Sequence, residues 1–347
     1  MNVLIVDDSA FMRKWLRELI ENQKGLRVVG VARNGKVALE LLDRIHVDVM
    51  TLDIEMPVMD GLETLIQVMR SHPLPVIMVS SHTDKGAKKT LQAMEYGAID
   101  VVLKPSHPKD YQKGELEQQL ITKLQEASNV DVRKLRAIRQ RMTRQLSPPP
   151  LHALKKTIVA IGTSTGGPRA LQAILTRLPN TFPFPIVIVQ HMPAPFTKTF
   201  ADRLDGISSI GVQEAVHDKK LEPGYAYIAK AGAHLTIEEK GGGLYMCCDA
   251  PPDPGEYHRP SVNRLFTSLS QITNVQVMAF VLTGMGSDGK DGAKSLKENG
   301  DATVIAESKT SAVVNGMPGA IIEAGYADGV WSLEEIIEQL AQMTESE

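Results

Sequence analysis

Residues 2–14, NVLIVDDSAFMRK, decide the fold class of the first part of the chain. An apolar strand at 2–6 runs into two aspartates and a serine, and apolar side chains from about 10 to 21 then recur at helical spacing. The same alternation continues through apolar strands at 26–32, 47–54, 75–81 and 100–105. Strands that are apolar on both faces need helices on both sides. The pattern therefore predicts a five-stranded, doubly wound parallel sheet.

A second set of alternating elements occupies the last part of the chain. We predict strands at 156–162, 185–191, 225–229, 234–239 and 277–284, and helices at 168–178, 261–272 and 290–299. The region near 225–248 contains a glycine-rich turn and predicts a small antiparallel β excursion. These features predict a second doubly wound α/β domain with its own core.

Between the two sets of strands lies a polar stretch that ends in Ser147-Pro148-Pro149-Pro150. The proline run stops any helix and forms a stiff spacer. We therefore predict one domain at 1–106, a basic linker at 107–153 and a second domain at 154–347. Six linker residues could contact phosphates of a nucleic acid, although a solvated helix is the favoured interpretation: Arg133, Lys134, Arg136, Arg139, Arg141 and Arg144.

Composition excludes several classes of protein. The 347 residues include 38 Lys and Arg against 41 Asp and Glu, so a globally basic nucleic-acid binder is not expected. The two cysteines, Cys247 and Cys248, are adjacent, which predicts neither a disulfide nor a metal site. The N-terminus does not resemble a signal peptide, and no apolar run is long enough to span a membrane. We therefore expect a cytoplasmic monomer without membrane insertion.

Polar side chains gather where the strands of the first predicted sheet end. They are Asp7, Asp8, Asp53, Ser80 and Lys104. Carboxyl ends of parallel strands share one edge, so three carboxylates should meet an ammonium there. An all-oxygen set suits Mg²⁺, and an aspartate can act as a nucleophile toward phosphate. Taken singly, each residue could instead be a turn former or a helix cap.

The motifs VDDSAFMR, LDIEMPVMDG, VIMVSS and GAIDVVLKP resemble the receiver domain of two-component response regulators, which has a flavodoxin-like fold. The resemblance implies that Asp53 accepts a phosphoryl group from a histidine kinase and that Mg²⁺ binds Asp7, Asp8 and Asp53. It also implies that Ser80 and Lys104 contact the phosphoryl group. Where the family often has an aromatic switch residue, this chain has Val101.

Two glycine-rich loops follow strands of the second domain. The first, Gly162-Thr163-Ser164-Thr165-Gly166, lacks the lysine of a phosphate-binding loop but places a serine on a tight strand-to-helix turn. The second, Gly284-Met285-Gly286-Ser287-Asp288-Gly289, matches a dinucleotide fingerprint. It lies late in the domain rather than at the first strand-to-helix turn, so we favour a role for Asp288 at the sheet edge instead.

A serine nucleophile needs a base and an acid that orients the base. His191 ends the strand PIVIVQ, and Asp288 follows another strand. Ser164, His191 and Asp288 would meet if these strands are neighbours. Taken alone, the serine could be a helix cap and the histidine structural. The chain order also differs from the Ser–Asp–His order of α/β-hydrolases. Another serine amidase or esterase, or a non-enzymatic binding module under receiver control, remains an alternative.

The segments GTSTGGP, VIVQHMP, HRPSVNRLF, TGMGSDG and NGMPGA resemble the catalytic domain of chemotaxis protein-glutamate methylesterases. Thr163 stands where the family commonly has alanine. The resemblance implies hydrolysis of γ-glutamyl methyl esters on methyl-accepting chemotaxis receptors, and deamidation of receptor glutamines, with no cofactor. It assigns a catalytic triad to Ser164, His191 and Asp288, an oxyanion donor to the amide of Met285, and a place near the reacting centre to Thr165. We also expect the receiver to cover the hydrolase cleft until Asp53 is phosphorylated.

Overall fold

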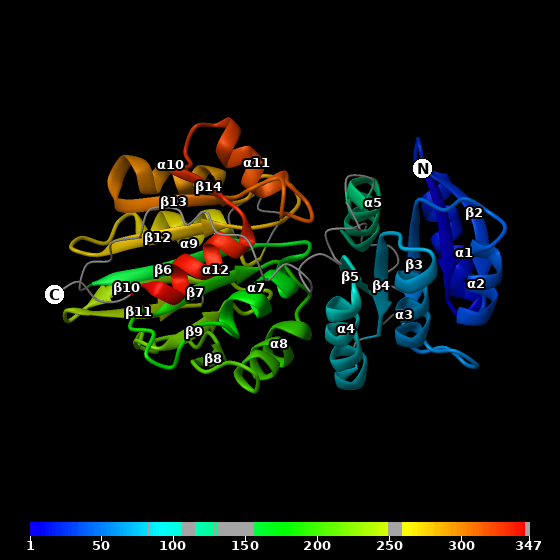
Figure 1. Cartoon of the computed structure of the whole chain (residues 1–347), viewed down its shortest axis with the longest axis horizontal. Coiled ribbons are helices and arrows are strands. Elements are labelled where there is room, and N and C mark those ends of the chain that lie inside the picture. The colour runs from blue at the N-terminus through cyan, green and yellow to red at the C-terminus, as the bar shows by residue number, and fades with distance from the viewer. Residues whose placement is uncertain (82, 106–114, 128–129, 131–155, 249–258, 344–347) are drawn as a thin grey trace. The chain divides into compact units, whose positions relative to one another are not determined.

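The computed structural model describes residues 1–81, 83–105, 115–127, 130, 156–248 and 259–343. The chain folds as two compact units, Met1–Arg141 and Met142–Glu347 (Figure 1). The boundary between them falls within 131–155, outside the described residues, as do the basic cluster and the proline run. Among the helices that are described, none combines the length and the apolar character needed to cross a bilayer.

A five-stranded parallel sheet forms the centre of the first unit, with strand order β2-β1-β3-β4-β5. Its strands are β1 (Asn2–Val6), β2 (Arg27–Ala32), β3 (Val49–Asp53), β4 (Val76–Ser80) and β5 (Asp100–Leu103). Its helices are α1 (Ala10–Glu21), α2 (Gly35–Leu42), α3 (Gly61–Ser71), α4 (Asp84–Tyr96) and α5 (Glu115–Ala127). Helices α2, α3 and α4 pack side by side. This arrangement confirms the predicted doubly wound fold.

Helix starts in the first unit follow directly from local sequence. The side chains of Ser9, Asn34, Asp60 and Thr83 each accept a hydrogen bond from the backbone N–H three residues later. Such caps satisfy amide groups that have no partner inside the helix. The caps Ser9 and Asp60 are not among the strand-end residues that we weighed as turn formers or helix caps. Of those residues, Asp7 and Asp53 do form local turns, because Asp7 accepts from the Ser9 amide at 2.8 Å and Asp53 from the Glu55 amide at 3.4 Å.

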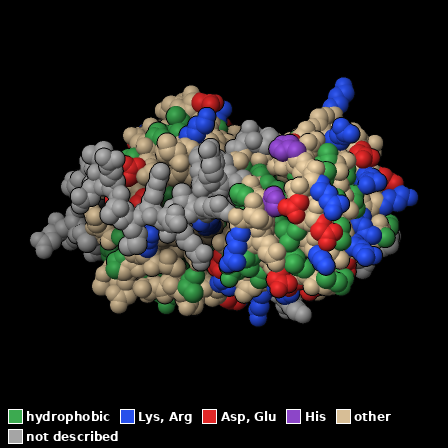
Figure 2. All heavy atoms as spheres, turned by 45° about the vertical axis from the view of Figure 1, so that its right-hand side comes forward, with side chains coloured by type: hydrophobic (Ala, Val, Ile, Leu, Met, Phe, Trp, Pro, Cys, Tyr) green, Lys and Arg blue, Asp and Glu red, His purple; other side chains and the backbone are tan. Residues whose placement is uncertain are grey.

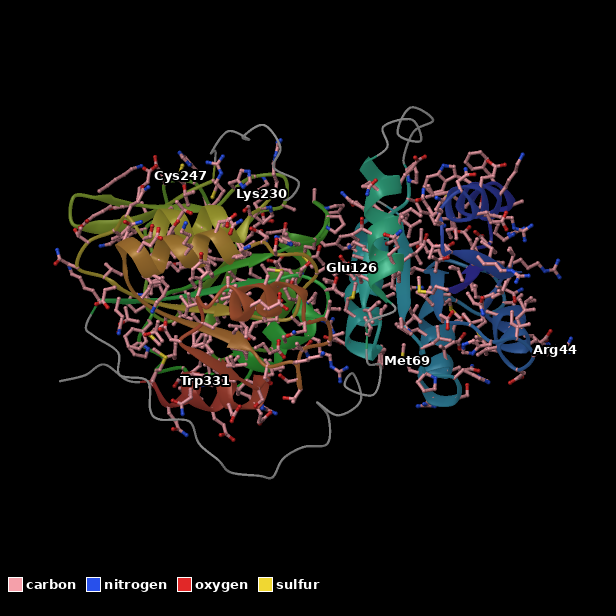
Figure 3. The ribbon with its side chains drawn as sticks, turned by 90° about the horizontal axis from the view of Figure 1, so that it is seen from above. Arg44, Met69, Glu126, Lys230, Cys247 and Trp331 are labelled. Atoms are coloured by element: carbon pink, nitrogen blue, oxygen red, sulfur yellow. The ribbon has the colours of Figure 1, made fainter. Side chains whose placement is uncertain are left out.

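Helix α5 occupies residues that we placed in the linker. Its side chains Leu120, Ile121 and Leu124 are buried, and the helix packs on β5. The Lys123 ammonium pairs with Asp100 and donates to the carbonyl of Val101 at 3.0 Å. Glu126, labelled in Figure 3, has its pKa raised by burial and by the nearby Asp100 carboxylate. The first unit therefore continues past residue 106.

The second unit contains a seven-stranded parallel sheet and a two-stranded antiparallel sheet. The order of the large sheet is β14-β13-β12-β6-β7-β9-β8, and the small sheet pairs β10 with β11. The strands of the large sheet are β6 (Thr157–Thr163), β7 (Ile186–Gln190), β8 (Gly211–Glu214), β9 (Tyr225–Ile228), β12 (Gln276–Val281), β13 (Asp301–Glu307) and β14 (Gly329–Trp331). The small sheet consists of β10 (Thr236–Lys240) and β11 (Gly243–Cys247).

The antiparallel region is smaller than predicted. Strand β9, which we expected within the excursion at 225–248, pairs in parallel with both β7 and β8. Among the described strands, only β10 and β11 pair with each other in antiparallel fashion, joined at the turn Gly241–Gly242. The residue pattern of a short apolar strand does not distinguish parallel from antiparallel pairing, because the direction of the strand depends on the connection that precedes it. Figure 3 shows Cys247 on β11 and Trp331 on β14 on opposite sides of the second unit.

Helices cover both faces of the large sheet. They are α7 (Gly167–Leu175), α8 (Phe196–Asp205), α9 (Val262–Leu269), α10 (Lys290–Asn299), α11 (Gly316–Glu323) and α12 (Leu333–Gln342). Helices α9, α10 and α11 pack in succession, and α12 packs on α7. Close contact between α9 and α10 requires glycine at 292, since a Cβ there would lie 2.7 Å from Cβ of Phe266. Figure 1 shows α12 and α7 together on the near side of the sheet.

Charged side chains of the first unit are mixed in sign on the face shown in Figure 2. Lys and Arg side chains alternate there with Asp and Glu rather than forming one basic stripe. A phosphate backbone is bound by a row of cations, so this face does not have the character of a nucleic-acid interface.

Candidate functional site

The first candidate site lies where β1, β3 and β5 end. The Lys104 ammonium lies 2.9 Å from a carboxylate oxygen of Asp7 and 2.7 Å from one of Asp53. The side chains of Asp7 and Asp53 are 1% and 4% exposed, so the loss of hydration disfavours the ionised form of both carboxylates. Strand order reverses between β1 and β3, which is where doubly wound sheets bind ligands.

Protonation of Asp53 reflects this burial. Loss of hydration raises the pKa of Asp53 from 3.8 to about 6, and the neighbouring Asp7 charge adds to the rise, while Lys104 opposes it. Burial also acts against the charge of Lys104, but Asp53 and Asp7 outweigh that effect and raise its pKa. The ammonium is thus held as a cation, and Asp53 bears a charge that its surroundings only partly offset.

The same three aspartates fit a divalent metal ion. One carboxylate oxygen from each of Asp7, Asp8 and Asp53 lies within 4.8 Å of the other two. Two of these side chains are buried and Asp8 is exposed, so the set is open to solvent on one side. Three carboxylates and one ammonium sum to a formal charge of −2. Hard oxygen ligands with that charge suit Mg²⁺.

Ser80 lies at the strand end next to this cluster. Asp53 is paired in register with Val79, so Ser80 follows at the end of the neighbouring strand β4. The Ser80 hydroxyl accepts a hydrogen bond from Thr90 at 2.9 Å, and its carbonyl accepts one from the Lys104 amide at 2.7 Å. Val101 is buried on β5. The expected contacts of Ser80 and Lys104 with a phosphoryl group stay predictions.

The second candidate site lies at the ends of β6, β7 and β12. Strand β6 is flanked by β7 and β12, and the strand order reverses at β6. The amide of Ser164 donates to the carbonyl of Thr283 at 3.0 Å, and the amide of His191 donates to the carbonyl of Thr163 at 3.1 Å. The structure therefore brings the two predicted glycine-rich loops and the histidine together at one sheet edge. That edge is where ligands bind in such sheets.

A tight turn presents Ser164 before helix α7. The amide of Gly167 donates to the Ser164 carbonyl at 2.8 Å, and Gly166 has a φ of +79°. This left-handed conformation favours glycine, which explains the residue type at 166. The loop after β12 passes directly beside the serine, because a Cβ on Gly284 would lie 2.9 Å from Cβ of Ser164. Met285 follows this glycine, so its backbone lies next to the turn.

His191 pairs with Asp288 through the ring nitrogen Nε2, at 2.8 Å from a carboxylate oxygen. Their side chains are 9% and 8% exposed. Burial alone would raise the pKa of Asp288, but hydrogen bonding and charge from His191, together with the amides of Asn263 and Val262, lower it to about 2. Asp288 is therefore a carboxylate at neutral pH. Because the Asp288 carboxylate can only accept, Nε2 of His191 carries the proton. In the neutral ring, Nδ1 of His191 is then the nitrogen that carries a lone pair.

Three further donors from the start of α9 hold the Asp288 carboxylate. The Ser261 hydroxyl donates at 3.0 Å, the Val262 amide at 2.7 Å and the Asn263 amide at 2.9 Å. The N-terminus of a helix favours negative charge, so this helix start stabilises the ionised form. The amide oxygen of Asn263 also accepts from Gly289 and Gly292 at 2.9 Å each, which fixes the start of α10.

We did not predict Ser261 or Asn263 as site residues. They lie in the segment HRPSVNRLF, and a serine before an apolar helix is the signal of a helix cap. Ser261 does cap α9 by accepting from the Arg264 amide at 3.4 Å. Its second role, toward Asp288, depends on a contact between residues 27 positions apart.

Thr283 connects the second loop to the serine turn. Its hydroxyl donates to the carbonyl of Thr165 at 2.8 Å, and its carbonyl accepts from the Thr163 hydroxyl at 2.7 Å. Its amide donates to the buried carboxylate of Glu307 at 2.8 Å. Thr165 is 2% exposed. These bonds hold the backbone of the turn that contains Thr165, and a place for Thr165 near the reacting centre stays a prediction.

Two family models match the chain. The model described as CheB methylesterase matches residues 159–340, and the model described as response regulator receiver domain matches residues 3–113. The first match covers the whole second site, and the second covers the aspartate cluster.

Curated relatives match over nearly the whole length. Proteins named protein-glutamate methylesterase/protein-glutamine glutaminase are 48% identical in Geobacillus kaustophilus, over 99% of this chain and 98% of the relative, and 39% identical in Bacillus subtilis, over 100% and 99%. Among solved structures, the Thermotoga maritima CheB methylesterase catalytic domain aligns with a TM-score of 0.51 and 43% identity. That alignment covers 54% of this chain and 98% of the solved domain.

Proposed function

The chain belongs to the CheB methylesterase family and carries a response regulator receiver domain, and from this premise we propose that a Ser164–His191–Asp288 triad hydrolyses γ-glutamyl methyl esters on chemoreceptors. The family's enzymatic activity, protein-glutamate methyl-ester hydrolysis with protein-glutamine deamidation, is that of this chain. The substrate, the triad and control by phosphorylation of Asp53 are the proposal.

One observation carries the triad: the 2.8 Å hydrogen bond between His191 Nε2 and an Asp288 carboxylate that four donors hold. A serine nucleophile needs a histidine base, and the histidine needs a carboxylate that orients its ring and stabilises its protonated form. The backbone bond from His191 to Thr163 sets this histidine beside the turn that presents Ser164. The pairing of a buried carboxylate with a strand-end histidine supports catalysis over a merely structural role.

In the first step, the Ser164 oxygen attacks the side-chain carbonyl carbon of the methyl ester. Its proton passes to Nδ1 of His191, and Asp288 stabilises the resulting imidazolium through the Nε2–H bond. Because Asp288 has a pKa of about 2, it stays ionised throughout and does not take up the proton. The base is active when the imidazole is neutral, with Nδ1 able to accept the serine proton.

The negative oxygen of the tetrahedral intermediate requires preorganised donors. We assign this role to the Met285 amide, since its loop passes within van der Waals reach of Ser164. A donor of this kind contributes about 2.7–4 kcal/mol of transition-state stabilisation. His191 then gives its proton to the leaving oxygen as the C–O bond breaks, which releases methanol, or to the leaving nitrogen in deamidation, which releases ammonia. Water hydrolyses the glutamyl-enzyme by the same base, which regenerates Ser164.

In the receiver, we assign Asp53 as the acceptor of a phosphoryl group from a histidine kinase. Asp7, Asp8 and Asp53 would hold Mg²⁺, which supplies positive charge against the phosphoryl oxygens. Lys104, already an ion-pair partner of Asp53, offers a second cation, and Ser80 offers a hydroxyl. The added charge of about −1.5 to −2 is large enough to change how the receiver packs, and so to regulate the hydrolase.

The decisive experiment measures methanol release from a methylated chemoreceptor, with and without a small-molecule phosphodonor and Mg²⁺. We expect release in both conditions and faster release with the phosphodonor. The Asp53→Ala variant should keep the basal rate and lose the increase. No methanol in either condition would refute the proposed substrate. An unchanged increase in Asp53→Ala would refute the assignment of the phosphorylation site.

A further inference from the structure

The side chain of Gln190 bridges the backbones of the serine and histidine loops. Gln190 is the last residue of β7 and is 1% exposed. Its amide nitrogen Nε2 donates to the carbonyl of Ser164 at 2.9 Å and to the carbonyl of His191 at 2.9 Å. One carboxamide thus donates a hydrogen bond to the backbone of each of the two residues between which the proton is transferred.

Chemistry fixes the orientation of this carboxamide. Both groups that face Nε2 are carbonyl oxygens, which only accept hydrogen bonds, so the flipped rotamer would oppose oxygen to oxygen. The amide oxygen Oε1 is buried without a hydrogen-bond partner among the described residues. A buried oxygen without a hydrogen bond destabilises the folded state. Here this cost accompanies the two hydrogen bonds that Nε2 donates to the carbonyls of Ser164 and His191.

Neighbouring residues are shaped around the same carboxamide. A Cβ on Gly167 would lie 2.1 Å from Oε1 of Gln190 and 2.5 Å from the Thr163 hydroxyl oxygen. Glycine at 167 therefore allows the start of α7 to pack directly against the Gln190 side chain. Its amide, in turn, gives the Ser164 carbonyl a second donor at 2.8 Å. The serine turn is thus held from the helix side and from β7 together.

We propose that Gln190 is a positioning residue for proton transfer, one that sets the separation of Ser164 and His191; this inference rests on the proposed function. His191 lies just past the end of β7, where the sheet no longer holds the backbone. Besides its amide bond to Thr163, the carboxamide bridge is what ties its carbonyl to the serine turn. Removing the bridge frees both loops to shift, and proton transfer depends steeply on such shifts.

The test uses the full-length chain with Gln190→Met, which keeps the length and loses both donors, and Gln190→Glu, which replaces the donors by acceptors. A matched control is Gln339→Met, which removes a glutamine that is 2% exposed on α12. Crystal structures of the wild type and Gln190→Met give the distance from Ser164 Oγ to His191 Nδ1. Steady-state kinetics of methanol release give kcat and KM, and thermal unfolding reports whether each variant folds.

We expect Gln190→Met to fold and to lengthen the Ser164–His191 distance by about 0.5 Å or more. Its kcat should fall by about 10- to 100-fold, with KM changed far less. Gln190→Glu should lose at least as much activity, and Gln339→Met should keep its kcat. An unchanged distance, or an unchanged kcat in folded Gln190→Met, would overturn the positioning role. If the wild type released no methanol, the proposed function would fail, while the two crystal structures would still decide whether Gln190 sets this geometry.

Discussion

Replacing Asp53 by asparagine should stabilise the receiver unit at neutral pH and leave it unchanged in acid. Burial and the Asp7 charge raise the pKa of Asp53 from 3.8 to about 6. At 1.36 kcal/mol for each pKa unit, the ionised carboxylate costs the folded state about 3 kcal/mol. The carboxylate is 4% exposed, so solvent screens little of this cost. Asparagine has nearly the same shape and no charge, and Lys104 keeps Asp7 as its partner at 2.9 Å.

The sign of the pH dependence follows from linkage. A carboxyl whose folded pKa is raised destabilises the folded state only where it must ionise. The cost is absent below about pH 3.8 and complete above about pH 6, so the gain in Asp53→Asn should appear across that window. Added Mg²⁺ should stabilise the wild type and not the variant, because the ion loses one of its three carboxylates.

The chain offers a clean assay for one unit at a time. It has 2 tryptophans: Trp15 lies in α1 of the receiver, and Trp331 lies in β14 of the second unit. In a Trp331→Phe background, tryptophan fluorescence during urea unfolding reports the receiver alone. Glu40→Gln, which neutralises an exposed carboxylate on α2, is the control and should change little at either pH. Equal stabilisation by Asp53→Asn at pH 4 and pH 8, or none at pH 8, would refute the electrostatic reasoning.

Three predictions concern the second unit. Ser164→Ala should abolish methanol release and leave phosphorylation of Asp53 intact, as measured by phosphate incorporation; residual hydrolysis at the wild-type rate would exclude this nucleophile. Ser261→Ala removes a donor 3.0 Å from Asp288, so the pKa of Asp288 should rise and kcat should fall about tenfold, equivalent to about 1.4 kcal/mol; an unchanged kcat across pH 5–9 would contradict this. The lowered pKa of Asp288 stabilises the folded state by about 2 kcal/mol above pH 3.8, and this is lost as the pH falls through about 2. The difference in unfolding free energy between Asp288 and Asp288→Asn, followed by Trp331 fluorescence in a Trp15→Phe background, should therefore shrink in acid.

Local sequence determined most of the secondary structure and the composition of both sheet edges. Strands that are apolar on both faces, such as 2–6 and 156–162, predict buried parallel strands, because the pattern depends only on neighbouring residues. Since carboxyl ends of parallel strands share one edge, Asp7 and Asp53 were expected together, and so were Ser164 and His191. The fold class was predicted correctly on this basis, and the family was predicted correctly from the resemblance of the motifs. Helix α5 was missed because its polar residues outnumber the few leucines that it buries, and the short edge strands β8 and β14 carry too few apolar residues to show a period.

Tertiary structure alone decided the contacts that tune the two sites. The choice of Nε2 of His191 as the partner of Asp288 depends on ring orientation, which no spacing in the sequence encodes. The start of α9 reaches Asp288 across more than twenty residues, and Gln190 faces a carbonyl 26 residues away. The raised pKa of Asp53 likewise arises from burial against Asp7 and Lys104, which come from separate strands. Periodicity and capping act within a few residues, whereas hydrogen bonds and charge act across whatever the fold brings within a few ångströms.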